Sequence, residues 1–349
     1  MGLRYIGSKA RVATRIADIL GRPTGGGEAM VDGFCGTGAV ATAAAQAGWN
    51  IRLNDQLYSS ATMAAARLVT TGQASFNTLG GYDNTLSQLN SVRGLEGSIT
   101  REYSPVSALL AGVERRYFTE QNARKIDGVR SQIEQWRVAG GLSDPEFRLL
   151  LADLMVASNK VANIAGTYGC FLREWSPVAL KTISLTAQEL LPRAVNVEVH
   201  VGDVLDVPYG PDDVAYFDPP YTKRQYAAYY HILETIAAGD SPVVEGITGL
   251  RPWKHLASDY CYRSKALRAL STLVSSCPAR RILLSYSSEG HVTKSDLKGV
   301  LADHGELIVH RLGPIGRYRP NRAAAASSTD VQEYVFEILR SSDKLRSVA

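Results

Sequence analysis

Cysteine, histidine and long apolar runs are all scarce in this chain, and each scarcity excludes a class of protein. The four cysteines (Cys35, Cys170, Cys261 and Cys277) lie far apart, without metal-ligand or disulfide spacing, which favours a reduced, cytoplasmic protein. The six histidines show no pattern such as HExxH, so no metal site is expected. No apolar run approaches the length of a membrane span, and the basic N-terminal stretch lacks the apolar core of a signal peptide.

Two catalytic signatures are missing as well. The sequence contains neither a Ser-His-Asp nucleophile elbow nor a phosphate-binding P-loop, so interpretations as a hydrolase or an NTPase lack a nucleophile or a phosphate cradle.

The composition nevertheless predicts a folded chain with a sizeable core. Of its 349 residues, 45% are hydrophobic and 21% are charged, which argues against wholesale disorder. Seven short apolar segments, several of them separated by helical patterns, predict a doubly wound, mostly parallel α/β sheet. The last two segments lack an obvious helix between them and could form an antiparallel pair. The segments are residues 30–34, 50–54, 197–201, 213–217, 280–285, 306–311 and 333–339.

A long interruption separates the second and third predicted strands. It contains about 140 residues, far more than a βαβ connection requires. Helical patterns over residues 114–139 and 144–160 predict that it folds as a helical insertion. We therefore expect a discontinuous core domain, residues 1–73 and 193–349, and an insertion domain, residues 74–192.

Positive charge is concentrated in one part of the chain. The formal net charge is +4, yet residues 251–281 carry seven Lys or Arg and one acid, a local net charge of +6. The stretch RYRPNR, residues 317–322, adds three more basic residues. Aromatic residues are interleaved with this charge, which suits a phosphate backbone, although a solvated basic face explains the charge equally well. Residues 240–281 are thus a candidate surface for nucleic acid.

The stretch MVDGFCGTGAVATAAAQAGW indicates a strand, a glycine turn and a helix. Such a turn lies at the carboxyl end of its strand, where doubly wound sheets bind ligands, and Gly36 and Gly38 let the backbone approach a ligand closely. A nicotinamide dinucleotide is not excluded, but Asp32 would repel pyrophosphate and favour a cation such as a sulfonium or an amino group. The competing interpretation is a tight turn that requires glycine for its own sake.

Two further acids end predicted strands. Asp55 closes the second strand 17 residues after Gly38, where an acid can accept hydrogen bonds from both hydroxyls of a ribose, or can simply cap a helix. Asp218 ends the fourth strand and begins Asp-Pro-Pro-Tyr. Its carboxylate and the Pro219 carbonyl could accept both protons of an aromatic amino group, while Tyr221 stacks on the ring. A simple proline turn is the alternative.

These motifs together resemble the S-adenosylmethionine-dependent DNA N6-adenine methyltransferases of the DNA adenine methylase family, alpha group. The resemblance covers most of the chain and rests on RYIGSK, DGFCGTG, NKVANIAGTYGCF and DPPY in that order. It is closest to methylases that accompany restriction systems. It implies a seven-stranded Rossmann-like methyltransferase sheet, S-adenosylmethionine as cofactor, and a flipped adenine in duplex DNA as substrate.

The family roles fall on matching positions of this sequence. The resemblance, together with the reasoning above, implies three catalytic residues: Asp218, Pro219 and Tyr221. The expected cofactor-binding residues are Tyr5, Lys9, Asp32, Phe34, Gly36, Gly38, Asp55, Asp203 and Asp218, although an ordinary strand-end acid is nearly as good an explanation of Asp203. The expected DNA contacts are Lys223, Arg224, Arg251, Lys254, Arg263, Lys265, Arg317 and Arg319.

Some alternatives stay open. Methylation of an amino group in ribosomal RNA can use a similar motif, whereas protein glutamine methylation is disfavoured because Asp begins the motif. A catalytically inactive DNA-binding module is the alternative from another class. No separate target-recognition segment is clear between residues 175 and 197, which leaves DNA reading to the insertion or to the basic stretch. We expect a monomer or weak dimer, with a cognate restriction endonuclease acting separately.

Overall fold

The computed structural model describes residues 6–25, 27–315 and 331–340, apart from the side chains of Pro314 and Ile315. The predicted contacts Tyr5, Arg317 and Arg319 lie outside this part. The chain divides into two compact units, which are described separately. No helix in the described ranges is long and apolar enough to cross a membrane.

The first unit comprises Ala65–Ala194 and Tyr226–Leu256, together with Ile6. The second comprises Gly7–Ala64, Val195–Gln225 and the described residues from Ala257 onward. The residues expected as an insertion, 74–192, therefore all fall in the first unit, which also takes in a later stretch of chain.

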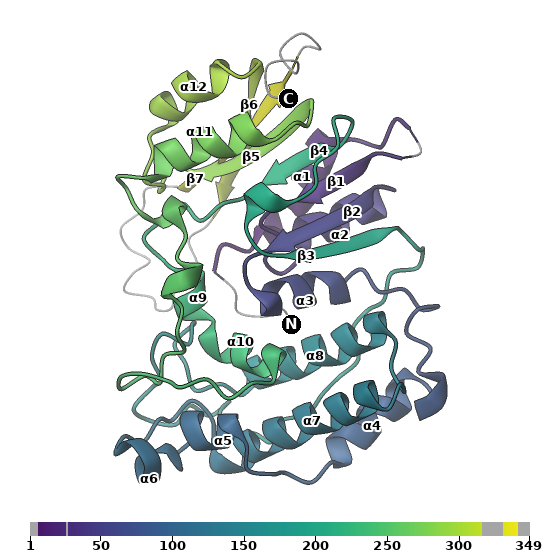
Figure 1. The fold of residues 1–349 in the computed structure, drawn as a ribbon, viewed down its shortest axis with the longest axis vertical. Helices are drawn as coiled ribbons and strands as arrows, with labels where there is room; N and C mark the ends of the chain where they lie inside the picture. Colours follow the sequence, from purple (N-terminus) through teal and green to yellow (C-terminus); the bar gives the residue numbers. More distant parts are fainter. Residues whose placement is uncertain (1–5, 26, 316–330, 341–349) are drawn as a thin grey trace. The chain divides into compact units, whose positions relative to one another are not determined.

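The second unit is built on one sheet of seven strands in the order β3-β2-β1-β4-β5-β7-β6 (Figure 1). Strands β1 to β5 are parallel, and β7 is antiparallel to both of its neighbours. The predicted α/β class, the seven strands and the antiparallel pairing of the last two are therefore confirmed. The strands are β1 Ala29–Asp32, β2 Asn50–Asp55, β3 Val197–Val201, β4 Val214–Phe217, β5 Arg281–Ser287, β6 Glu306–Ile315 and β7 Val331–Leu339.

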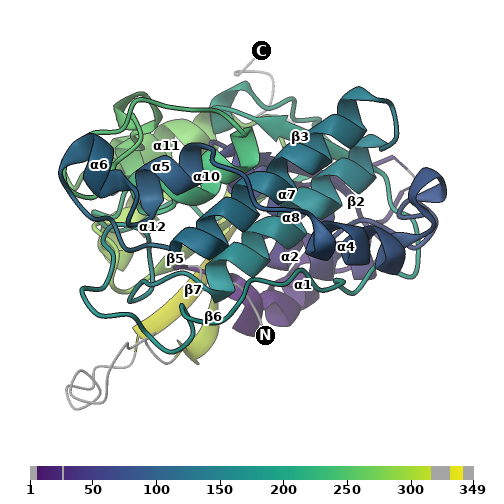
Figure 2. The ribbon, with the colours of Figure 1, turned by 90° about the horizontal axis from the view of Figure 1, so that it is seen from below.

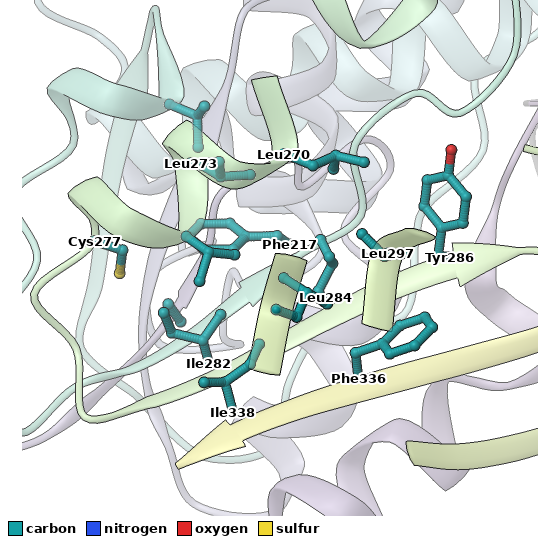
Figure 3. Close-up of a cluster of buried hydrophobic side chains, with 14 of the residues drawn as sticks. Phe217, Leu270, Leu273, Cys277, Ile282, Leu284, Tyr286, Leu297, Phe336 and Ile338 are labelled. Atoms are coloured by element: carbon teal, nitrogen blue, oxygen red, sulfur yellow. The ribbon is translucent and has the colours of Figure 1, made fainter. Parts of the chain in front are cut away.

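Helices α11 (Ala266–Ser276) and α12 (Lys294–Ala302) cover one face of the sheet. Figure 3 shows the contact: Phe217 of β4 and Leu284 of β5 point toward leucines of both helices. These side chains alternate along their strands with residues of the other face, as a pleated strand requires. Their burial supplies the apolar area that holds this side of the unit together.

Helix α1 (Ala13–Leu20) lies against the opposite face of the sheet. Arg281, which alternates with the buried Ile282, donates hydrogen bonds to the carbonyls of Ile19 and Leu20 at the end of this helix. Helix α2 (Ala39–Gln46) packs beside α1, and α3 (Tyr58–Ala66) follows β2. The central parallel strands β1 and β4 are buried along their whole length, whereas the edge strand β3 has no buried residue.

The first unit is helical. Its helices are α4 Tyr82–Ser91, α5 Ser98–Tyr103, α6 Ser107–Ala111, α7 Glu120–Val138, α8 Asp144–Lys160, α9 Tyr226–Tyr229 and α10 His231–Ala238. Helices α7 and α8 lie side by side (Figure 2). Thr119 caps the start of α7, because its hydroxyl accepts from the Asn122 amide, and α8 begins with a capping box formed by Ser143 and Glu146.

Buried aromatic side chains form the centre of the first unit. The rings of Tyr103 and Tyr117 meet edge to face at 5.9 Å between centroids, and His231 packs against both. Burial lowers the pKa of His231 to about 4, and its Nε2 lies 3.1 Å from the Tyr168 carbonyl oxygen. A histidine held in this way is a core residue of the unit.

Candidate active site

The second unit places two acids side by side at the carboxyl edge of its sheet. Strand β1 is followed along the chain by its neighbour β2 on one side, whereas its other neighbour is β4. This is a topological switch point, where open α/β sheets bind ligands. Asp32 ends β1 and is paired in register with Tyr216, two residues before Asp218.

The glycine turn after β1 is shaped by close packing within the unit. A Cβ on Gly33 would lie 2.8 Å from atoms of Phe217 and of Val204. Gly38 has a φ of +76°, and a Cβ there would lie 2.7 Å from the Cα of Ala64 in α3. The turn therefore requires these two glycines for its own packing, which was one of the two interpretations open from sequence.

This packing predicts a large loss of stability for Gly38→Ala. The variant combines a left-handed φ with a backbone clash that no side-chain rotation relieves, so we expect destabilisation of roughly 2–4 kcal/mol. Gly48→Ala is a matched control, because Gly48 has a φ of +101° but no atom within 4 Å of an added Cβ. Thermal and urea unfolding measure both variants; equal losses would contradict the role assigned to the Ala64 contact.

Asp55 anchors the same turn. Its Oδ2 accepts from the Gly36 amide at 2.9 Å, and its Oδ1 accepts from the Leu57 amide at 2.9 Å. The buried Asn54 side chain donates to the carbonyl of Gly33. These bonds fix the orientation of the Asp55 carboxylate at the end of β2, beside the turn and next to the switch point.

Asp32 is a buried acid with unsatisfied hydrogen-bonding capacity. Its side chain is 2% exposed, and its Oδ1 has no hydrogen-bond partner among the described residues. Burial, reinforced by the negative charges of Asp218 and Asp55, raises its pKa well above the ordinary value of an aspartate. A cation or an N–H donor placed against Asp32 would satisfy this oxygen and compensate its charge.

Asp218 lies in a buried ion cluster. Its Oδ1 is 3.1 Å from the Lys9 ammonium, and the other partner of Lys9 is Glu333, whose Oε2 lies 2.7 Å away. Lys9 lies in the short helix η1 (Lys9–Arg11), and Glu333 lies in β7. Burial raises the pKa of Asp218 to about 6, although the Lys9 charge acts in the opposite direction. Sequence reasoning named Lys9 and Asp218 but missed Glu333.

Tyr221 completes this cluster. Its hydroxyl lies 3.4 Å from Glu333 Oε1, and the Lys9 ammonium lies 5.2 Å from the centre of its ring. The backbone carbonyl of Tyr221 accepts from the His291 amide at 2.9 Å. Pro219, between Asp218 and this tyrosine, is buried. The three residues predicted to be catalytic are thus held together at the end of β4.

Phe34 belongs to the glycine turn itself, and Asp203 follows β3 in the chain. The Phe34 ring meets the Tyr260 ring edge to face at 5.4 Å. Asp203 is exposed, and its carboxylate accepts from the Leu205 amide and caps the short helix η3 (Val204–Asp206). The hydrogen bond of Asp203 is thus that of a helix cap, and its contact with a cofactor stays a prediction. Tyr260, from η5 (Asp259–Cys261), is an additional aromatic residue near the turn that sequence reasoning assigned only to a basic surface.

The loop that follows Tyr221 is clamped to the chain around Ser258. The Gln225 side chain accepts from the Ser258 amide and donates to the Ser258 carbonyl, at 2.9 and 3.2 Å. We call this pair of bonds the Gln225 clamp. The neighbouring Lys223 and Arg224 are exposed. The clamp therefore holds two candidate phosphate-binding side chains close to the catalytic motif.

The other basic candidates differ in their surroundings. In the second unit, Arg263 and Lys265 are exposed, and Lys265 pairs with Asp259 at 2.9 Å. In the first unit, Lys254 lies exposed in η4 (Lys254–Leu256), whereas Arg251 donates from both Nη atoms to the Asp240 carboxylate. That ion pair would have to open before Arg251 could contact a phosphate.

No group of three or more His, Cys, Asp or Glu that could hold a metal ion occurs in the described part of the chain. All four cysteines are free, and Cys35 is buried within the glycine turn. Burial raises the pKa of the Cys35 thiol well above its usual value, which disfavours the thiolate needed for nucleophilic chemistry.

Comparison with known proteins was consistent with this geometry. Residues 5–298 match the family described as D12 class N6 adenine-specific DNA methyltransferase. The type II methyltransferase M.FokI of Planomicrobium okeanokoites is 32% identical over 96% of this chain and 52% of its own length. The modification methylase StsI of Streptococcus sanguinis is 31% identical over 97% of this chain and 52% of its own length.

A shorter relative aligns over more of its length. The type II methyltransferase M.NlaIII of Neisseria lactamica is 31% identical over 87% of this chain and 89% of its own sequence. By contrast, the chain spans about half the length of M.FokI and of StsI, 52% in each case.

Proposed function

Because the chain belongs to the D12 class N6 adenine-specific DNA methyltransferase family, we propose that it transfers a methyl group from S-adenosylmethionine to N6 of adenine in duplex DNA. One observation carries this proposal: Asp218, Pro219 and Tyr221 lie together at the switch point, beside a buried acid with an unsatisfied oxygen. The matched family and the names of the relatives support the same reaction.

The residues around the turn fit S-adenosylmethionine. When bound, this cofactor supplies a methyl group activated by an adjacent sulfonium. Asp32 would face its positive charge, because its Oδ1 has no partner among the described residues and the nearby negative charges of Asp218 and Asp55 favour an approaching cation or amino group. Asp55 would bind the ribose, and Phe34 with Tyr260 would offer aromatic surface to the adenine of the cofactor. Lys9, Gly36, Gly38 and Asp203 complete the proposed binding set.

Asp218 prepares the target amino group in this proposal. Its carboxylate accepts a hydrogen bond from one N6–H and the Pro219 carbonyl accepts a hydrogen bond from the other, which concentrates the nitrogen lone pair for attack on a methyl carbon. The bound cofactor would supply the methyl group for direct transfer: the N–C bond would form as the S–C bond breaks with its electron pair on sulfur, so no covalent enzyme intermediate is required. Asp218 holds the proton that N6 releases, and Tyr221 stacks on the extruded base.

This role predicts that activity falls at acid pH. Asp218 must be ionised to accept the amino proton, and its pKa is raised to about 6. Above that pH the carboxylate is present, and below it kcat/KM should fall about tenfold per pH unit. A pH series of kcat/KM for duplex DNA, measured at saturating cofactor, gives the acid limb. A flat profile down to pH 5 would exclude an ionised Asp218 from the reaction.

The basic residues supply the proposed DNA contacts. Lys223 and Arg224 follow the catalytic motif directly, and the Gln225 clamp holds their loop in place. Arg263, Lys265, Lys254 and Arg251 would add to the attraction for phosphate, and Arg317 and Arg319 stay predictions outside the described residues. We assign reading of the target sequence to the helical insertion, residues 74–192, or to the basic segment, residues 240–281.

The partners and the location belong to the same proposal. We propose a cytoplasmic protein that acts on duplex DNA as a monomer or weak dimer, within a restriction-modification system whose endonuclease acts separately. Modified-base sequencing of DNA from a methylation-free host expressing the chain tests the base and the target together. N6-methyladenine at one recurring site supports the proposal, and modification of cytosine or of ribosomal RNA alone would replace it.

A further inference from the structure

A buried acid on the last strand, Glu333, competes with Asp218 for one ammonium. Its side chain is 6% exposed, as is that of Lys9, so solvent screens their ion pair little. The Lys9 nitrogen lies closer to Glu333, at 2.7 Å, than to Asp218, at 3.1 Å. Two carboxylates therefore share one positive charge, and neither is fully neutralised.

The second oxygen of Glu333 faces the catalytic motif. Its Oε1 lies 3.4 Å from the Tyr221 hydroxyl, so one side chain contacts both Lys9 and the tyrosine proposed to stack on the base. Glu333 thus touches two neighbours of Asp218 without touching the reacting atoms. Such a residue acts through the groups that it positions.

We infer that Glu333 is a positioning residue: it holds the Lys9 ammonium back from Asp218, so that the Asp218 carboxylate remains a strong hydrogen-bond acceptor for the N6 amino group. This inference rests on the proposed function. In a tight pair with an ammonium, the negative charge of a carboxylate is largely compensated. Such a carboxylate would be a weaker hydrogen-bond acceptor for an amino group. Glu333 prevents this by taking the shorter contact with Lys9.

The charges around Asp218 give the sign of the expected effect. The groups that face it are Lys9 from η1, Asp32 from β1, Tyr216 from β4, Tyr221 and Glu333. Removing the Glu333 charge removes a like charge and frees Lys9 to approach Asp218. Both changes favour the ionised form, so the pKa of Asp218 should fall in Glu333→Gln.

The experiment follows the ionisation of Asp218 directly. In protein labelled with ¹³C at aspartate carboxyl carbons, the Asp218 resonance is assigned by its absence in Asp218→Asn and titrated without cofactor or DNA. We expect a midpoint near the value of about 6 in the wild type, and a midpoint lower by about one unit in Glu333→Gln. The acid limb of kcat/KM should move to lower pH by the same amount, and kcat should fall.

Glu337→Gln is a matched control. Glu337 lies on the same strand and is also buried, but it pairs with Arg281 and His310. This variant should lose stability and leave both the Asp218 midpoint and the acid limb unchanged. An unchanged or higher Asp218 midpoint in Glu333→Gln would overturn the inference. A wild-type protein that does not methylate adenine would instead overturn the proposed function, and the titration is read independently of that outcome.

Discussion

Asp218→Ala is expected to abolish methyl transfer, lowering kcat by about 10³-fold or more, while the chain keeps its fold. The substitution removes the acceptor of one amino proton and the negative charge that stabilises developing positive charge on N6. Removal of a single preorganised electrostatic group from an active site typically costs about 10²–10³-fold. Lys9 retains Glu333 as a partner at 2.7 Å, so no buried ammonium is left without a counter-charge.

The measurement is single-turnover transfer of a labelled methyl group, with circular dichroism and the melting temperature recorded for the same samples. Asp213→Ala provides a control at the opposite end of β4. Asp213 accepts from the amides of Ala29 and Gly210 and pairs with Arg52, so its loss should lower stability with little effect on kcat. If Asp218→Ala unfolds the protein, the acid is structural; if it retains wild-type kcat, the proposed mechanism is wrong.

Asp32→Asn should weaken binding of the cofactor and raise the stability of the free protein. The substitution removes the charge proposed to face the cofactor cation, and loss of one partner of a buried charge pair costs about 2–5 kcal/mol. We therefore expect about 10²-fold weaker binding of S-adenosylmethionine. In the free protein the same change removes a buried carboxylate whose oxygen has no partner among the described residues, so it should raise stability at neutral pH.

The sign of the stability change depends on pH. The pKa of Asp32 is raised in the folded state, so the folded protein binds the proton more tightly than the unfolded chain. The wild type therefore loses stability as pH rises above the unfolded pKa, whereas Asp32→Asn does not. Calorimetric titration with cofactor and melting curves at pH 5 and pH 8 measure both effects. The exposed Asp206 provides the control variant Asp206→Asn, which should change neither, and unaltered binding by Asp32→Asn would remove it from the cofactor site.

Much of the sheet could be predicted because its central strands, β1 and β4, are buried on both faces. Short apolar runs such as the one ending at Asp218 are typical of parallel strands covered by helices, and all seven proved to be strands. Helices were harder to place. Helix α12, Lys294–Ala302, was missed because its residues carry little apolar pattern. The stretch from Tyr226 to Ala238 forms two helices, α9 and α10, which are interrupted at Tyr230, where φ is −119°.

The site was predictable where its residues lie in short motifs. Asp32 and Asp55 end their strands and Asp218 directly follows β4, so alignment of the strand ends brings the three acids to one edge. Glu333 escaped notice because its contact with Lys9 spans 324 positions. One signal was present: β7 reads VQEYVFEIL, and an acid at an inward-facing position of an apolar strand requires a partner. Nothing local in the sequence identifies that partner as Lys9.

The sharing of Lys9 between Asp218 and Glu333 also has a consequence for how the chain folds. The three residues lie near the beginning, in the middle and near the end of the described chain, so ribosomal synthesis makes Glu333 available long after Asp218. In the folded chain β7 covers the edge of β5 and supplies Glu333, so without β7 the ion pair of Lys9 with Asp218 would remain and β5 would have an open edge. Contacts between such distant residues form late in folding, because closing long loops costs entropy. The ion cluster around Asp218 is therefore complete only when β7 has joined the sheet. The ionisation of Asp218 would then report whether the sheet has fully assembled.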